Sequence, residues 1–158
     1  MRKTIVWITL ALVLIALTVI ALGHSGPSEQ RGTIRLVPFD VLPGAVRCIV
    51  RGCPATRSSW HYLIVNGVGN IVVFMPLGMI LYVALKHQAS APSRPLLVAT
   101  LLGALVSLIY EIVQLWIPGR VTALEDIILN AAGTLLGSFT IKWGEAIFNP
   151  NKELPVST

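Results

Sequence analysis

Three apolar stretches of this 158-residue chain carry carboxylate or amide side chains about one helical turn apart. Spacings of three and four residues place two side chains on the same face of a helix. Carboxylates beside amides suit general acid–base catalysis, hydrogen bonding to a polar ligand, or the handling of protons and cations. The pairs are Asn66 with Asn70, Glu111 with Gln114, and Asp126 with Asn130.

The composition indicates that these stretches lie in a membrane. Hydrophobic residues make up 54% of the chain and charged residues only 12%, whereas a soluble domain carries about 25% charged residues. Because a helix needs roughly 20 residues to cross the hydrocarbon, we predict an all-α, polytopic membrane protein that forms a single domain over residues 1–158. Four transmembrane helices are predicted at 4–22, 63–85, 95–117 and 126–143, with a loop at 24–61.

The first span has an alternative interpretation as a cleaved signal peptide. Arg2 and Lys3 precede its apolar run, and Ala21-Leu22-Gly23 resembles a cleavage site. The run is longer than the usual 7–15 residues of the apolar core of a signal peptide, so we predict that the span is retained.

The orientation follows from the basic residues next to the spans. With the N-terminus inside, each side of the membrane holds six Lys and Arg residues. The positive-inside rule applied to the totals therefore does not decide the orientation. Arg2 and Lys3 directly precede the first span, and the loop from Lys86 to Arg94 has cations but no acid. We predict cytoplasmic termini and an extracytoplasmic long loop.

The order of the hairpins brings the polar ends of three spans together. The second and fourth spans begin on the outer side and the third ends there, directly below Arg120. A carboxylate in hydrocarbon costs a few kcal/mol even on lenient insertion scales, so Glu111 is expected to face the bundle interior. We predict a polar pocket that opens to the outer surface.

Some of these polar residues have an alternative role as interhelical fasteners, typically worth about 0.6 kcal/mol per hydrogen bond. For Asn66, Asn70 and Gln114, packing and function both remain open. A carboxylate in the membrane costs more free energy than an interhelical hydrogen bond returns. We therefore predict that the charged residues of the pocket are functional, namely Glu111, Arg120 and Asp126.

Other residues of the spans are expected to serve helix packing. Small residues let two helix backbones approach closely, and a proline softens a helix. The residues concerned are Pro76, Gly78, Gly133 and Gly137.

The long loop contains the pattern of a short amphipathic helix. Pro43 can open such a helix and Gly52 can close it. Its apolar residues recur at helical spacing, while Arg47 and Arg51 fall on another face, as in a helix lying on lipid headgroups. An irregular solvated loop is an equally open alternative.

Cys48 and Cys53 lie in the same segment. If the loop is extracytoplasmic, they could form a disulfide, but a regular helix through both would point them to different faces. They also lack the second pair of ligands that a zinc site needs. We therefore expect free or only casually paired cysteines.

In order and spacing, the polar residues resemble the VanZ-like family of small bacterial membrane proteins. The resemblance covers Pro38 to Gly137, although the segment from Gly44 to Ser59 matches no family element. It implies a bacterial plasma membrane protein associated with glycopeptide resistance, chiefly to teicoplanin, and adds Pro38 and Phe39 to the candidate ligand-binding residues. The matching elements are Val37-Pro38-Phe39, Asn66, Asn70-Ile71, Phe74-Met75-Pro76-Leu77-Gly78, Glu111-Ile112-Val113-Gln114, Arg120, Asp126-Ile127-Ile128-Leu129-Asn130-Ala131-Ala132-Gly133 and Gly137.

From the pocket and the resemblance we predict a non-enzymatic envelope protein that binds an amphiphile. A membrane lipid, a lipid-linked cell-wall precursor or a lipid-tailed glycopeptide would fit, with Arg120 holding phosphate or carboxylate. The amides Asn66, Asn70 and Gln114 would donate hydrogen bonds to it. No cofactor and no metal are predicted, and nothing resembles a nucleic-acid-binding module.

Two alternatives from other classes remain open. An intramembrane enzyme could use Glu111 and Asp126 as general base and acid, but the chain has no Ser-His or Cys-His dyad, metal-ligand set or nucleotide loop. A small transporter would require a homo-oligomer, because four helices enclose little space, and the sequence does not determine the oligomeric state.

Overall fold

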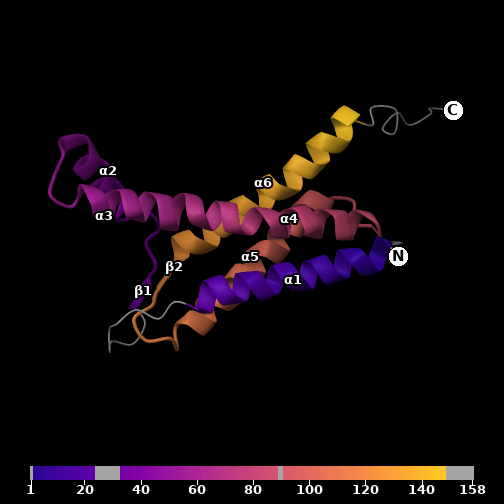
Figure 1. Ribbon diagram of the computed structural model, residues 1–158, viewed down its shortest axis with the longest axis horizontal. Helices are drawn as coiled ribbons and strands as arrows, with labels where there is room; N and C mark the ends of the chain where they lie inside the picture. Colours follow the sequence, from indigo (N-terminus) through magenta and orange to yellow (C-terminus); the bar gives the residue numbers. More distant parts are fainter. Residues whose placement is uncertain (1, 24–32, 89–90, 149–158) are drawn as a thin grey trace.

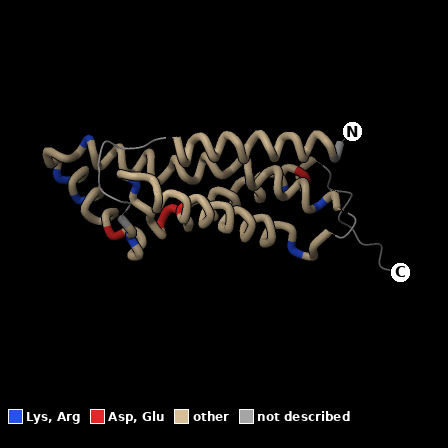
Figure 2. The backbone as a smooth tube through the Cα atoms, turned by 90° about the horizontal axis from the view of Figure 1, so that it is seen from below, with Lys and Arg blue, Asp and Glu red and all other residues tan. Residues whose placement is uncertain are grey.

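A computed structural model describes residues 2–23, 33–88 and 91–148, and long helices make up most of this part of the chain (Figure 1). Four helical stretches are long and apolar enough to cross a membrane, at Thr4–Leu22, Thr56–Lys86, Pro95–Gln114 and Leu124–Phe148. The predicted all-α fold with four spans is therefore confirmed, and the chain is a multi-pass membrane protein. Lys and Arg residues gather toward the two ends of the helix bundle (Figure 2), as water-exposed ends require.

The first span, α1 (Arg2–Leu22), packs against the bundle through one face, and most of its other side chains are exposed. Leu10 and Leu17 form a buried cluster with Phe74 and Leu77 of a neighbouring helix. The hydroxyl of Thr18 also hydrogen-bonds with Tyr110 Oη at 2.9 Å. Retention of the first span stays a prediction.

The second span is one continuous helix built of three segments. These are α3 (Thr56–His61), the π-helix η1 (Tyr62–Gly69) and α4 (Asn70–Lys86). The predicted boundary at residue 63 is thus too late, because the polar residues before it extend the helix beyond the apolar run. A π-helix has a wider turn than an α-helix, is rare, and frequently occurs at functional sites.

The other two spans also differ at their ends from the prediction. Helix α5 (Pro95–Gln114) stops three residues before the predicted limit, since the chain turns at 115–120, where Gly119 takes a positive φ of 77°. Helix α6 (Leu124–Phe148) begins earlier and runs past Lys142. Helical hydrogen bonding in α6 continues past Lys142 to Phe148. A charged residue at the end of an apolar run therefore does not end the helix.

Helices α4 and α6 approach each other through glycines. A Cβ atom on Gly78 would collide with the backbone of Thr134, and one on Gly137 would collide with the backbone of Met75. Ser138 Oγ donates a hydrogen bond to Gly78 O at 2.9 Å across the same contact. Small residues of this kind allow the close backbone packing that drives helix association in lipid.

A short parallel strand pair, which the sequence did not predict, joins two distant loops. Strand β1 (Thr33–Arg35) pairs with β2 (Val121–Ala123), and Ile34 lies opposite Thr122. Three residues are too few to show the alternation that identifies a strand. Of the predicted loop 24–61, residues 24–32 lie outside the described part of the chain.

The amphipathic helix predicted in the long loop is confirmed as α2 (Leu42–Arg51). It lies beside α3 at the end of the bundle opposite the N-terminus (Figure 1). Arg47 and Arg51 are exposed, as are Val46 and Val50. The irregular-loop alternative is excluded.

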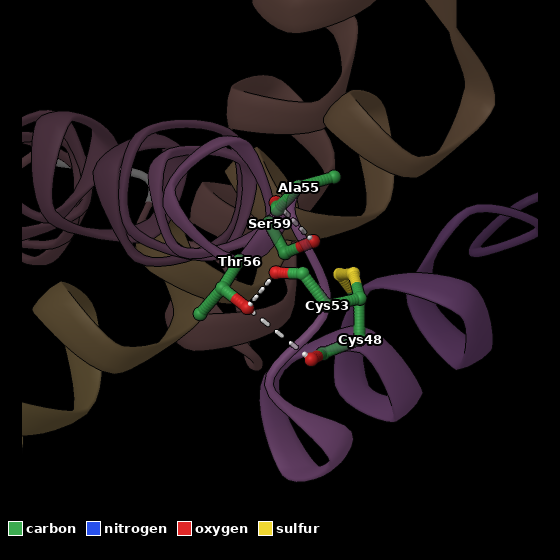
Figure 3. The surroundings of a disulfide bond; sticks show 5 residues. All are labelled: Cys48, Cys53, Ala55, Thr56 and Ser59. Carbon is green, nitrogen blue, oxygen red and sulfur yellow. Dashed lines mark hydrogen bonds between the residues drawn. A yellow bond between two sulfur atoms is a disulfide. The ribbon is translucent and has the colours of Figure 1, made fainter.

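The cysteines are disulfide-bonded, so the expectation of free or casually paired cysteines is wrong (Figure 3). Gly52 ends α2 in a left-handed conformation, and Cys53 therefore lies after a turn instead of continuing the helix. The turn brings the Cα atoms of Cys48 and Cys53 to 5.1 Å. Thr56 Oγ1 donates to Cys53 O at 2.6 Å, which ties the turn to the start of α3.

Replacement of Gly137 tests the α4–α6 contact. Gly137→Ala should lower the free energy of unfolding by about 1–3 kcal/mol, because overpacking forces the two backbones apart. Gly144→Ala is the matched control on the same helix, since a Cβ there meets nothing within 4 Å. Thermal unfolding in detergent, followed by tryptophan fluorescence, should give a lower midpoint for Gly137→Ala only. Equal midpoints for the two variants would contradict the packing argument.

Candidate functional site

A cleft of about 760 Å³ lies where α1 and α5 end and α6 begins. We call this the cleft end of the bundle. Apolar residues from α1 and α4 line part of the cleft, among them Leu17, Ile20, Val73 and Phe74. The rest of its lining includes most of the predicted binding residues, namely Asn66, Asn70, Glu111, Gln114, Arg120, Asp126 and Asn130.

Pro38 and Phe39 are the predicted binding residues that the structure does not bring to the cleft lining. The backbone N–H of Phe39 instead donates to Glu125 Oε2 at 2.9 Å. Phe39 also has a positive φ of 61°, which is uncommon for a bulky residue and marks a tight turn. This segment therefore holds the loop against α6.

Glu111 is buried at the end of α5, with only 4% of its surface exposed. Its Oε2 accepts a hydrogen bond from the backbone N–H of Ala123 at 3.1 Å, and its carbonyl oxygen accepts one from Thr122 Oγ1 at 3.2 Å. Glu111 thus anchors β2 to α5 while its carboxylate lines the cleft.

Asp126 and Asn130 lie one turn apart on α6 and each meets a different helix. Asn70 Nδ2 of α4 donates to Asp126 Oδ1 at 2.7 Å. Asn130 Nδ2 donates to Ser107 Oγ of α5 at 2.8 Å. Asn130 Oδ1 is buried and has no hydrogen-bond partner among the described residues. The amides therefore cross-link helices and still leave an acceptor free in the cleft.

Arg120 and Gln114 close the end of α1. Arg120 Nη2 donates to Ala21 O at 2.8 Å, and Gln114 Nε2 donates to the same oxygen at 3.0 Å. The last carbonyls of a helix have no partner within the helix, and a cation there also complements the helix dipole. Arg120 Nε is buried without a partner in the described structure, so this guanidinium keeps unused hydrogen-bonding capacity.

Glu125 is a central site residue that the sequence analysis missed. It is 3% exposed and accepts hydrogen bonds from Phe39 N and from Tyr62 Oη, the latter at 2.8 Å. Arg35 Nη1 lies 3.8 Å from Glu125 Oε1. The acidic pair at the start of α6 was a visible signal. Its partners, however, come from the start of the second span and from the long loop, which share no period with α6.

Buried side chains fill the bundle beyond the cleft. Among the largest that are completely buried are Leu77, Ser107, Thr134 and Ser138. The arrangement can bind a molecule at the cleft end, where hydrogen-bonding and apolar groups line the same space.

Comparison with known proteins adds one finding. A model of the VanZ/LLP1 family matches residues 7–148, which is nearly the whole chain. Comparisons with curated proteins and with solved structures give no significant match.

Removal of the Glu125 carboxylate tests its positioning role. Glu125→Ala should lower the free energy of unfolding by about 3 kcal/mol, because it deprives buried donors and an arginine of their acceptor. Trypsin should then cleave after Arg35 faster, since β1 loses its anchor. Glu145→Ala is the control on the same helix. It breaks a partly exposed pair with Lys86 and should cost about 1 kcal/mol or less. Unchanged cleavage after Arg35 in Glu125→Ala would contradict the assignment.

Proposed function

The chain belongs to the VanZ/LLP1 family, and from this premise we propose that its cleft binds the polar head of a membrane amphiphile. The observation that carries the proposal is the mixed lining of the cleft. Carboxylates, amides and Arg120 line it together with apolar side chains of α1 and α4. A molecule with a charged head and a hydrocarbon tail matches both kinds of lining.

The unused hydrogen-bonding groups support binding over a purely structural role. Buried polar groups are almost always paired, yet Arg120 Nε and Asn130 Oδ1 have no partner among the described residues, and both residues line the cleft. A phosphate or carboxylate on the ligand would use the arginine.

The proposed location is the plasma membrane of a bacterium, with both termini in the cytoplasm and the cleft end outside. The disulfide supports this orientation, because disulfides persist in oxidising compartments. Cys48 and Cys53 are the only cysteines of the chain. After reduction of intact cells, a membrane-impermeant maleimide should label them without lysis. Labelling that requires lysis would reverse the orientation.

An enzymatic alternative has one observation in its favour. Glu111 and Asp126 line the same cleft, so general acid–base chemistry on a lipid-linked substrate is the second candidate function. Turnover of such a substrate by purified protein, lost in Glu111→Gln, would establish it. Transport by a single chain is the weaker alternative, because completely buried side chains close the bundle beyond the cleft.

Binding of dioleoyl phosphatidylglycerol to purified protein, measured by native mass spectrometry, tests the proposal. Arg120→Gln should weaken binding about tenfold, because it removes a charge-assisted contact to the phosphate. Arg94→Gln is the matched control, since Arg94 is exposed next to the opposite end of α5. Because Arg120 also holds α1, the unfolding midpoint of each variant is measured in parallel. Undiminished binding by Arg120→Gln would contradict the proposal.

We further propose that the bound amphiphile is a glycopeptide with a lipid tail or a lipid-linked cell-wall precursor, and that binding protects against teicoplanin-type antibiotics. In a sensitive host, the wild type should raise the inhibitory concentration of teicoplanin several-fold, with vancomycin tested alongside. Glu111→Gln at a matched membrane level should not. If neither protein protects, the proposed role in teicoplanin resistance is contradicted, while the proposed lipid binding is unaffected.

A further inference from the structure

The described lining of the cleft contains three carboxylates and two guanidinium groups, together with the imidazole of His61. The carboxylates are those of Glu111, Glu125 and Asp126, and the guanidinium groups are those of Arg35 and Arg120. Arg35 and Glu125 lie within 3.8 Å and form a pair. This leaves Arg120 as the one guanidinium for both remaining carboxylates.

Neither of those carboxylates forms a salt bridge in the described part of the chain. Glu111 accepts a hydrogen bond from the backbone N–H of Ala123, and Asp126 accepts one from the amide of Asn70. Both partners are neutral. A charge within the membrane that has no counter-ion costs free energy. A positively charged group in the cleft would lower this cost.

Asn130 adds a second, independent observation in the same cleft, an acceptor without a donor. It is 7% exposed, lines the cleft, and its buried Oδ1 accepts no hydrogen bond from any described residue. A buried acceptor without a donor costs free energy, and an N–H or O–H group of a ligand would satisfy it. Asp126 and Asn130 are one turn apart on the same face of α6, and both line the cleft together with Glu111.

We propose that the cleft recognises a zwitterionic amphiphile whose head carries a primary ammonium and a phosphate. The ammonium donates to Glu111, Asp126 and Asn130 Oδ1, and the phosphate pairs with Arg120. A primary ammonium has three N–H donors, which matches three acceptors. The hydrocarbon tail lies along the apolar lining from α1 and α4. This inference rests on the proposed function and specifies its ligand class.

Native mass spectrometry of the full-length protein with three dioleoyl lipids tests the inference. The lipids are phosphatidylethanolamine, its N-acetylated derivative and phosphatidylglycerol, which share their chains and phosphate. Phosphatidylethanolamine should bind at least about tenfold more tightly than the other two, because they lack the ammonium. This comparison uses the wild type and does not depend on the folding of any variant.

A variant pair locates the preference in the cleft. Asn130→Ala should reduce the preference for phosphatidylethanolamine, because it removes the unpaired acceptor. Thr140→Ala should keep it, since the Thr140 hydroxyl bonds only to Leu136 O of its own helix. Soluble phosphoethanolamine at the lipid concentration should not displace the lipid, since it lacks the tail. Displacement would overturn the assignment of an amphiphile.

Equal or tighter binding of phosphatidylglycerol or of the N-acetylated lipid would overturn the inference, while leaving amphiphile binding intact. In that case a proton, and not an ammonium, would neutralise the carboxylates. Absence of saturable binding by all three lipids would remove the proposed function together with the inference. The two failures are therefore distinguishable.

Discussion

Hydrocarbon offers no hydrogen-bond partners, and this constraint governs the polar architecture of the protein. Several polar side chains inside the bundle are placed where a group on another helix or loop can meet them. Asn70 meets Asp126 at 2.7 Å and Asn130 meets Ser107 at 2.8 Å. The final carbonyls of α1 are subject to the same constraint, and Arg120 reaches Ala21 O at 2.8 Å. The cleft is the exception, because some of its polar atoms remain unpaired.

The close contact of α4 and α6 determines where the polar pairs meet. A Cβ atom on Gly133 would collide with the backbone of Ile71, which directly follows Asn70. The glycines thus fix the relative positions of the two backbones next to the Asn70–Asp126 hydrogen bond. Packing and site are consequently one arrangement, since a shift between α4 and α6 would also separate the groups that line the cleft.

Periodicity explains which parts of the molecule could be predicted from the sequence. The apolar and polar residues of the spans repeat at helical spacing. The position of Glu111, Asp126 and Asn130 at one end of the bundle therefore follows from residue spacing and from the order of the helical hairpins. Glu125 was missed because its partners, such as Tyr62 and the backbone of Phe39, belong to segments with no shared period. The disulfide was missed although Gly52 was correctly predicted to end α2. Its consequence for Cys53, which lies beyond the turn, was not followed through.

The β1–β2 pair has a consequence for how the protein is made. Strand β1 follows the first span, whereas β2 directly precedes the last one. A chain emerges from the ribosome N-terminal end first, so β1 cannot pair until most of the sequence, including β2, has been synthesised. The hydrogen bond of Ala21 O likewise requires Arg120, and that of Asn70 requires Asp126. The cleft therefore cannot form until β2 and the start of α6 have been synthesised, and the earlier helices enter the membrane with these polar groups still unpaired.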